Sequence, residues 1–239
     1  MTKKELNQNA KFNQELIKTF EPDFILSDQP INRFNFFSNN QDQNTIIKNE
    51  KLTELKKDIN SIENCNFKKN SKNLILGKGN VNSPIMLIGE SPSKEEDNTG
   101  EIFVGEVGEL LKKMLLAIKI ELTDVYLSYA INFKIPDDKK PTLNEIMRYA
   151  NFLKKHISII DPKIIVLMGS TAMEAIIGSN NKITDLRGNW KEIILKNKTY
   201  PVMITFSPSY LIRFPKNKKF SWEDLKKIRQ KIKDLKINI

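Results

Sequence analysis

The chain has 239 residues, of which 39% are hydrophobic and 28% charged, so it contains enough apolar material for one core of moderate size. No apolar run approaches the roughly 18 residues that a membrane span needs, and the start of the chain lacks the apolar middle of a signal peptide. The single cysteine, Cys65, excludes an internal disulfide and any site built from several thiolates. We therefore expect a soluble protein of the reducing cytoplasm.

The net charge of +10 is unevenly placed along the chain. Residues 1–60 hold nine basic and nine acidic side chains, whereas residues 213–239 hold ten Lys/Arg against three Asp/Glu. A basic tail on a nearly neutral body suggests a polyanionic partner, usually nucleic acid. A solvated, lysine-rich helix explains the charge equally well.

The first 64 residues differ in composition from the rest of the chain. They are rich in Asn, Gln and Lys, and two stretches, residues 5–20 and 51–62, are weakly amphipathic. The polar residues 38–44 between them predict a loop. We expect residues 1–64 to form a partly helical extension and residues 65–239 to form the main domain, which ends in a basic helix.

Beyond about residue 74, short apolar runs alternate with helical patterns. The runs are typical of strands buried on both faces and comprise residues 85–88, 125–131, 164–168 and 202–206. Helical spacing of apolar residues follows in 107–118 and in 142–157, where Thr142 and Glu145 make a capping box. We expect Ser170 to cap a third helix after Gly169. A last helix begins near Ser221 and places Trp222, Leu225, Ile228, Ile232 and Leu235 on one face. This alternation predicts a three-layer αβα domain with a four-stranded, mostly parallel central sheet.

Ligands of such sheets bind beyond the carboxyl ends of the strands. The segments there are residues 89–93, 132–136, 169–170 and 207–210. Phe103 follows the first of them in a glycine-flanked, acidic loop. A ring displayed there stacks on a flat ligand such as a base, worth on the order of 1–3 kcal/mol. The alternative is that the ring folds back onto the helix that follows.

The first loop and four later segments share their order and spacing with one known family. The loop reads GESPSKEEDNTGEIFVGEVGELL, and the later segments read VYLSYAINFKIPDDKKPT, DPKIIVLMG, ITDLRGNW and TFSPSYLIRFPKNKKFSWEDL. They resemble the motifs of the family 4 (type-4) uracil-DNA glycosylases, among them GEAPG, an ED pair, RG-x-W and TFHP-x-YLLR-x-P. The resemblance covers roughly residues 73–235 and implies the fold of that superfamily.

The resemblance implies a DNA repair enzyme that hydrolyses the N-glycosidic bond of uracil, or a related damaged base, flipped out of DNA. The sugar becomes positive and the base negative, so the site needs a stacking ring, hydrogen-bond donors and a carboxylate that positions water. The residues implied are Glu90 and Ser207 for catalysis, Ser91, Phe103 and Tyr129 for uracil binding, and Glu96 and Asp97 as an acidic pair that orders the loop or takes part in catalysis.

The resemblance also implies a DNA-binding surface. Ser207 and Ser209 would approach phosphates, Leu211 or Ile212 would enter the gap in the base stack, and Arg213, Lys216, Lys218 and Lys219 would neutralise the DNA backbone. The expected partner is single- or double-stranded DNA containing uracil. A monomer is the default state for an enzyme that needs access to long DNA.

Three residues depart from the family pattern. Ser207 replaces a histidine that donates to uracil, Tyr129 replaces an asparagine that reads the uracil amide edge, and Ser93 replaces a glycine. Losing one such donor typically costs about 10²–10³ in rate. Asn132 compensates only if the strand bulges or ends early. A DNA-binding homologue with impaired catalysis is therefore the main alternative.

Many family members hold a [4Fe–4S] cluster with four cysteines. Cys65 lies near where one ligand would sit, but one cysteine cannot hold a cluster within one chain. We expect no cofactor, and we expect Cys65 to be a small buried residue.

Two other enzyme classes deserve comparison. A serine hydrolase would use one of four serines near strand ends, but the only histidine, His156, falls in the helix expected at residues 142–158, away from those ends. We expect His156 to be a surface or packing residue. The acidic cluster of Glu95, Glu96 and Asp97 suits Mg²⁺, but an acidic, solvated loop is the simpler interpretation, so no metal is expected.

Overall fold

The computed structural model describes residues 33–136, 139–178 and 182–238, with side chains described from residue 43 onward. The chain divides into two compact units, residues 1–42 and 43–239, and the second is the subject below. The boundary falls inside helix α2 (Arg33–Asn60), which runs through the loop predicted at residues 38–44. That prediction was wrong, because no glycine or proline interrupts the polar segment. The predicted helix at residues 5–20 lies outside the described residues.

The second half of α2 belongs to the main unit. Its residues Leu52, Leu55 and Ile59 are buried in the core. The boundary between the two compact units therefore falls after residue 42. The composition of the sequence had placed it after residue 64.

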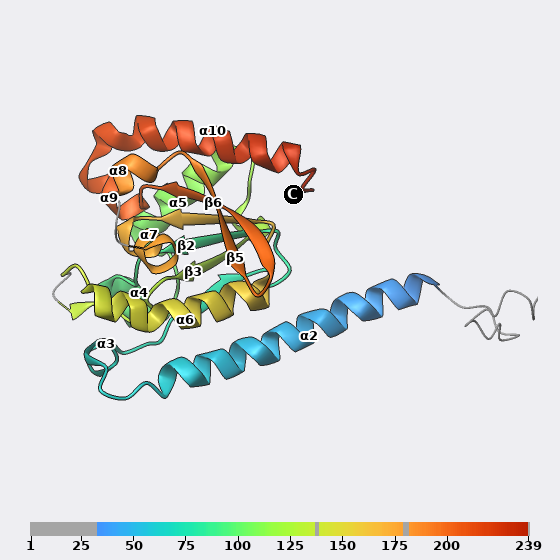
Figure 1. Ribbon diagram of the computed structural model, residues 1–239, viewed down its shortest axis with the longest axis horizontal. Helices are drawn as coiled ribbons and strands as arrows, with labels where there is room; N and C mark the ends of the chain where they lie inside the picture. The colour runs from blue at the N-terminus through green and yellow to red at the C-terminus, as the bar shows by residue number, and fades with distance from the viewer. Residues whose placement is uncertain (1–32, 137–138, 179–181, 239) are drawn as a thin grey trace, which may run out of the picture. The chain divides into compact units, whose positions relative to one another are not determined.

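A six-stranded sheet with the order β1-β3-β2-β4-β6-β5 forms the centre of this unit (Figure 1). The strands are β1 (Gly77–Gly79), β2 (Ile85–Gly89), β3 (Val125–Tyr129), β4 (Ile164–Met168), β5 (Trp190–Leu195) and β6 (Lys198–Thr205). The four central strands are parallel, and β1 and β5 add antiparallel edges. The predicted αβα class and parallel centre are confirmed. The predicted number of four strands was wrong, because the two edge strands carry little burial signal: β1 has only three residues and β5 is largely exposed.

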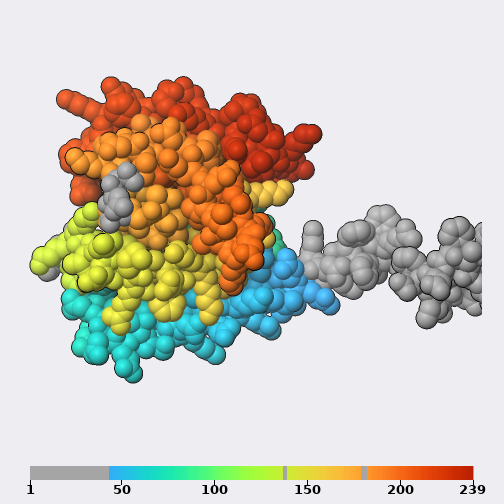
Figure 2. Space-filling view, in the orientation of Figure 1, coloured from blue at the N-terminus to red at the C-terminus, as the bar shows by residue number. Residues whose placement is uncertain are grey.

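Helices cover both faces of the sheet. They are α3 (Asn66–Lys69), α4 (Lys94–Thr99), α5 (Gly105–Ala117), α6 (Leu143–Ile160), α7 (Ser170–Ile177), α8 (Ile183–Leu186), α9 (Pro208–Arg213) and α10 (Lys218–Asp234), with 3₁₀ turns at Leu122–Asp124 and Pro215–Asn217. The Thr142/Glu145 capping box predicted for α6 is present. In Figure 2, the red surface of α10 and the yellow surface of α6 lie on opposite sides of the orange edge strand β5.

Alternate residues of each strand feed two separate apolar cores, as the pleat of a sheet requires. One core contains Met86, Ile88 and Tyr126 with α2, α6 and α7, and the other contains Ile85, Leu87 and Tyr129 with α5 and α10. No helix in the described part of the chain is long and apolar enough to cross a membrane.

Two details of the predicted helices differ. Trp222 and Leu235 were expected on the buried face of α10 but are 43% and 40% exposed, and Ser221 and Asp224 are buried instead. Gly169, and not Ser170, is the N-cap residue of α7. Ser170 is its first helical residue.

Candidate functional site

Glu90 follows the carboxyl end of β2, and its carboxylate lies against the first turn of α7. The Oε1 atom accepts hydrogen bonds from the Thr171 backbone N–H at 3.1 Å and from the Ser170 hydroxyl at 3.3 Å. Gly169 makes this approach possible, because its φ is +107° and a Cβ there would lie 2.3 Å from the Glu90 carboxyl carbon. The positive end of α7 favours negative charge at this position. Glu90 is thus a fixed carboxylate at the rim of the sheet.

The Phe103 ring packs over Gly89, which is the last residue of β2 and the one before Glu90. A Cβ on Gly89 would lie 2.8 Å from the Phe103 ring, so only glycine allows the ring to come this close. Phe103 adopts φ +50° in its loop and remains partly exposed, with one side against the core shared with α5. The ring therefore packs on the core, as the alternative interpretation expected, and it also reaches the surface. Its stacking on a base stays a prediction.

Tyr129 ends strand β3 and fills the space next to Phe103. The two ring centroids lie 5.0 Å apart with the planes tilted by 42°. The Tyr129 hydroxyl donates to Glu96 Oε1 at 2.5 Å and accepts from the Phe103 backbone N–H at 3.4 Å. Burial and the neighbouring Glu96 carboxylate raise the pKa of Tyr129 far above its usual value, so the phenol keeps its proton. Its hydroxyl is committed to partners within the protein.

The two acids of the loop hold the backbone in place. Glu96 closes a capping box with Ser93 at the start of α4, and its other oxygen receives the Tyr129 hydroxyl. Asp97 accepts from the backbone N–H groups of Lys72 and Asn73 at 2.9–3.1 Å. Glu96 and Asp97 are 2% and 5% exposed. Their oxygens therefore order the loop, which leaves them poorly placed to bind a hydrated magnesium ion. The expectation of a solvated acidic loop was wrong, because the segment forms helix α4 and buries both of these acids.

Ser207 ends the turn after β6 and begins α9. Its hydroxyl accepts from the Tyr210 backbone N–H at 3.3 Å, as an N-cap residue does, and lies 3.1 Å from the Ser209 hydroxyl. Leu211 is only 1% exposed, whereas Ile212 is half-buried. Of the two residues predicted to enter the gap in the base stack, Ile212 is thus the accessible one. Arg213, Lys216, Lys218 and Lys219 are all exposed on the segment that follows.

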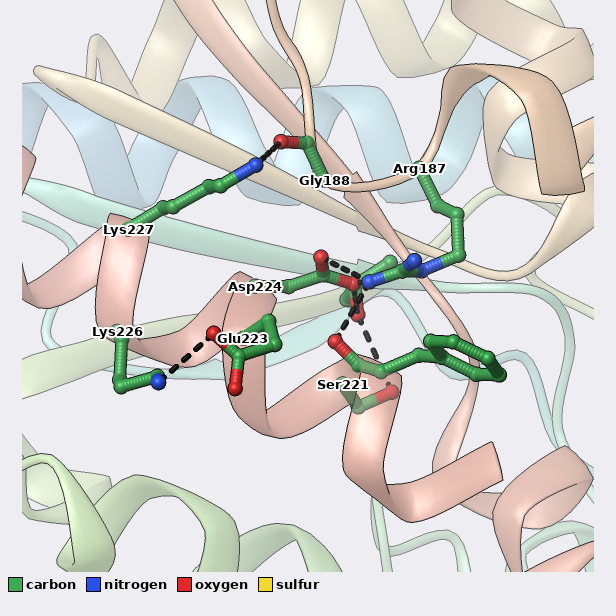
Figure 3. Close-up of polar contacts among 9 residues, drawn as sticks. Arg187, Gly188, Ser221, Glu223, Asp224, Lys226 and Lys227 are labelled. Atoms are coloured by element: carbon green, nitrogen blue, oxygen red, sulfur yellow. Dashed lines mark hydrogen bonds and ion pairs between the residues drawn. The ribbon is translucent and has the colours of Figure 1, made fainter. Parts of the chain in front are cut away.

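A buried ion pair anchors this segment to the sheet (Figure 3). Arg187, just after α8, donates through Nε to Asp224 Oδ2 at 3.1 Å and through Nη2 to the other oxygen. Asp224 on α10 is fully buried and also accepts from the Thr205 hydroxyl at 2.8 Å. Burial raises the pKa of Asp224, and the hydrogen bonds from Thr205 and Arg187 oppose that rise.

Aromatic rings extend the same anchor toward the basic residues. The Arg187 guanidinium lies 5.4 Å from the Phe206 ring centroid and 5.2 Å from that of Phe220. Phe206 stacks on Tyr210 at 4.8 Å, and Tyr210 contacts Phe214 at the same distance. The turn at Ser207 and the start of α10 therefore form one connected unit.

Neither Arg187 nor Asp224 was predicted as a functional residue. A signal was present, since Asp224 falls on the helical face of Leu225, Ile228 and Ile232. A carboxylate on a buried face needs a cationic partner or hydrogen-bond donors.

His156 and Asn132 are structural in this fold. Ser128 donates its hydroxyl to the Leu76 carbonyl at 3.0 Å, so His156 Nδ1 donates to Ser128 and His156 Nε2 accepts from the Tyr126 hydroxyl at 3.0 Å. Burial lowers the pKa of His156 to about 3. These contacts confirm a packing role, and no hydrogen bond recorded for the described residues joins His156 to the rim serines. Asn132 is buried and donates to the Ile75 carbonyl at 3.0 Å, so it does not take the place of the missing asparagine.

The surroundings of Cys65 do not fit an iron–sulfur cluster. Such a cluster needs four thiolates, and Cys65 is the only cysteine of the chain. Its sulfur lies 3.0 Å from the Tyr149 hydroxyl, and the rings of Phe67 and Phe133 pack on Tyr149 with centroids 6.3 and 6.4 Å away. Cys65 is 4% exposed, which confirms its expected burial.

Comparison with known proteins shows the family to which the chain belongs. A model of the uracil DNA glycosylase superfamily matches residues 76–229. The type-4 uracil-DNA glycosylase of Thermotoga maritima is 36% identical over 172 residues, which are 71% of this chain and 88% of that protein. The enzyme of the same name from Sulfurisphaera tokodaii is 32% identical over 76% of this chain and 84% of its own, and that of Archaeoglobus fulgidus is 29% identical over 75% and 92%.

The matched residues include the carboxyl end of β2, the Phe103 loop, the Arg187 anchor and the Ser207 turn. On the extent of these matches, the chain belongs to the uracil-DNA glycosylase superfamily, among the relatives of the type-4 enzymes.

Proposed function

We propose that the protein is a DNA repair glycosylase that hydrolyses the N-glycosidic bond of uracil, or of a related damaged base, flipped out of DNA. The observation that carries this proposal is the shared position of an acid and a ring at the end of β2. Glu90 follows Gly89 directly, and the Phe103 ring packs over Gly89. A carboxylate and an aromatic ring at the same end of one strand suit a site that stacks a base and stabilises positive charge on the sugar attached to it.

Each group has a role in the reaction. The bond from sugar C1′ to the base nitrogen breaks, and its electron pair leaves with the base. Water then bonds to C1′ and releases a proton. Glu90 would stabilise the positive sugar and orient the water. The Ser170 hydroxyl and the Thr171 backbone N–H hold its carboxylate in place before substrate arrives. Phe103 would stack on the base, and Ser91 and Tyr129 would line the pocket.

The segment from Ser207 to Lys219 is the proposed DNA contact. Ser207 and Ser209 lie at the turn, Ile212 is the accessible apolar residue beside buried Leu211, and the basic residues follow. We further propose a monomer without an iron–sulfur cluster, in a reducing cytoplasm that suits the free Cys65.

An excision assay tests the proposal directly. Purified protein is incubated with uracil-containing single- and double-stranded oligonucleotides, and alkali-labile abasic sites are measured. We expect product from the natural protein and a loss of at least about 10²-fold after Glu90→Ala or Phe103→Ala. Glu106→Ala, on the exposed side of α5, serves as the control. Variants that keep full activity would show that the site lies elsewhere.

A specific observation favours a second function, a DNA-binding homologue without excision. Tyr129 and Ser207 replace the two uracil-reading groups of the family, and both hydroxyls are engaged within the protein. This reading predicts no abasic product even at high protein concentration, while binding to DNA persists. The same assay, paired with a binding measurement, separates the two functions.

A further inference from the structure

The Tyr129 ring packs against the Phe103 ring, which is the proposed stacking surface for a base. A flat base between two rings needs about 3.5 Å on each side, or about 7 Å between the ring centroids. The Phe103 and Tyr129 centroids are 5.0 Å apart. No base therefore fits between them while Tyr129 keeps this position.

Several contacts hold the Tyr129 ring in that position. Its hydroxyl donates to Glu96, a residue that also caps α4 and is 2% exposed. The Phe103 backbone N–H donates to the same hydroxyl. Tyr129 is 3% exposed, and its ring lies against Gly89, where a Cβ would be 2.8 Å from the ring. Moving the ring would leave the buried Glu96 oxygen without its donor, which costs free energy.

We propose that Tyr129 is a specificity-determining residue: its ring, held by Glu96, narrows the base pocket beside Phe103 and limits the excision of uracil. The inference rests on the proposed function, because it takes Phe103 as the stacking ring. A pocket narrowed in this way selects by size and shape, since its wall presents a ring and its hydroxyl is already engaged. Removing the ring should therefore widen the range of bases accepted.

Three substitutions test the role of the ring. Tyr129→Asn and Tyr129→Leu remove it, the latter keeping an apolar side chain against Phe103. We expect both to raise kcat/KM for uracil release by about tenfold or more, in the range typical of a change in pocket shape. Tyr129→Phe keeps the ring and loses only the hydrogen bond to Glu96, so its gain should be smaller. Tyr126→Phe, on the other face of β3, is the matched control.

A binding measurement separates this inference from the proposed function. In a Glu90→Gln background, affinities are compared for duplexes that contain either uracil or a tetrahydrofuran abasic analogue. With Tyr129 present we expect the uracil duplex to bind only slightly more tightly than the abasic one, because the Tyr129 ring limits the contact between the base and Phe103. With Tyr129→Asn or Tyr129→Leu the uracil duplex should bind about tenfold more tightly than the abasic one.

The outcomes are distinct. If folded Tyr129→Asn and Tyr129→Leu proteins show no gain in either measurement, the ring does not restrict the pocket. If Tyr129→Phe gains as much as they do, the hydrogen bond and not the ring is responsible, and the inference is wrong as well. A rise in relative affinity for uracil without any base release supports the inference and contradicts the proposed glycosylase activity. Thermal unfolding establishes that each variant is folded.

Discussion

At the scale of single residues, the buried polar groups of this protein occur in matched sets. His156, Tyr126 and Ser128 satisfy one another on one face of β3, and Tyr129 and Glu96 do so on the other. The neutral imidazole of His156 donates to one hydroxyl and accepts from another. A protonated imidazole would have two donors, and the Tyr126 hydroxyl would lose its acceptor.

This arrangement predicts an acid-sensitive fold. The pKa of His156 is lowered to about 3 by burial, so between that value and about 6.5 the unfolded chain binds a proton that the folded chain does not. Stability from this group is complete above pH 6.5 and falls by about 1.4 kcal/mol for each unit of pH below it. Chemical unfolding between pH 4.5 and 7.5 measures the slope.

His156→Gln removes the titrating group. In a plot of the free energy of unfolding against pH, this variant should therefore have a slope that is smaller by about 1.4 kcal/mol per pH unit below pH 6.5. Tyr126→Phe removes a hydrogen-bond partner of His156 but leaves the imidazole in place. It should therefore lower the free energy of unfolding at every pH without changing the slope against pH. Parallel curves for the natural protein and His156→Gln would rule out this contribution.

The burial of single residues was predicted correctly where only one role was open to the residue. The lone Cys65 and His156 were both expected to pack, and both are buried. The burial of Asp224 was not predicted, because a carboxylate in a lysine-rich segment is usually solvated. Only the tertiary structure brings Arg187 and Thr205 to it.

At the scale of elements, α10 combines an anchor and an exposed basic face. Asp224, Leu225, Ile228 and Ile232 hold the helix on the sheet. Lys216, Lys218 and Lys219 lie at and before its start, exposed, and the ion pairs recorded for the described residues involve none of them. Their charge is available to a polyanion next to the Ser207 turn.

Replacing these three lysines by alanine should weaken DNA binding and reduce its salt dependence. Each phosphate contact contributes about 0.9 to the slope of log K against log salt on duplex DNA, so loss of all three should lower the slope by about 2.7. Titrations of a labelled duplex at several salt concentrations measure it. The control removes the same charge from α2, at Lys51, Lys56 and Lys57, which are also exposed. If both triple variants behave alike, the effect comes from net charge and not from a local contact.

At the scale of the whole molecule, the domain boundary follows burial more closely than composition. Residues 43–64 look like the polar extension before them, yet Leu52, Leu55 and Ile59 pack into the core shared with α6. A deletion of residues 1–42 should therefore leave the stability of the main unit nearly unchanged.

A deletion of residues 1–64 should unfold the protein or nearly so. Each large core side chain removed costs about 2–5 kcal/mol, and the total stability of a domain is about 5–15 kcal/mol. Thermal unfolding of both truncated proteins compares them. Leu55→Ala in the full chain isolates one core residue and should cost about 2–5 kcal/mol. Equal stability of the two truncated forms would place the boundary at residue 64 after all.

The sequence by itself determined the parallel sheet, the helices around it and the segments at the carboxyl ends of its strands. Apolar runs and helical periodicity indicate which face of each strand or helix is buried. Both patterns are contained in a short stretch of neighbouring residues, so the sequence alone shows them. Tertiary structure alone decided the edge strands β1 and β5, the anchor between Arg187 and Asp224, and the packing of Tyr129 against Phe103. These features depend on distances between residues far apart in the chain, and no local pattern of residues contains those distances.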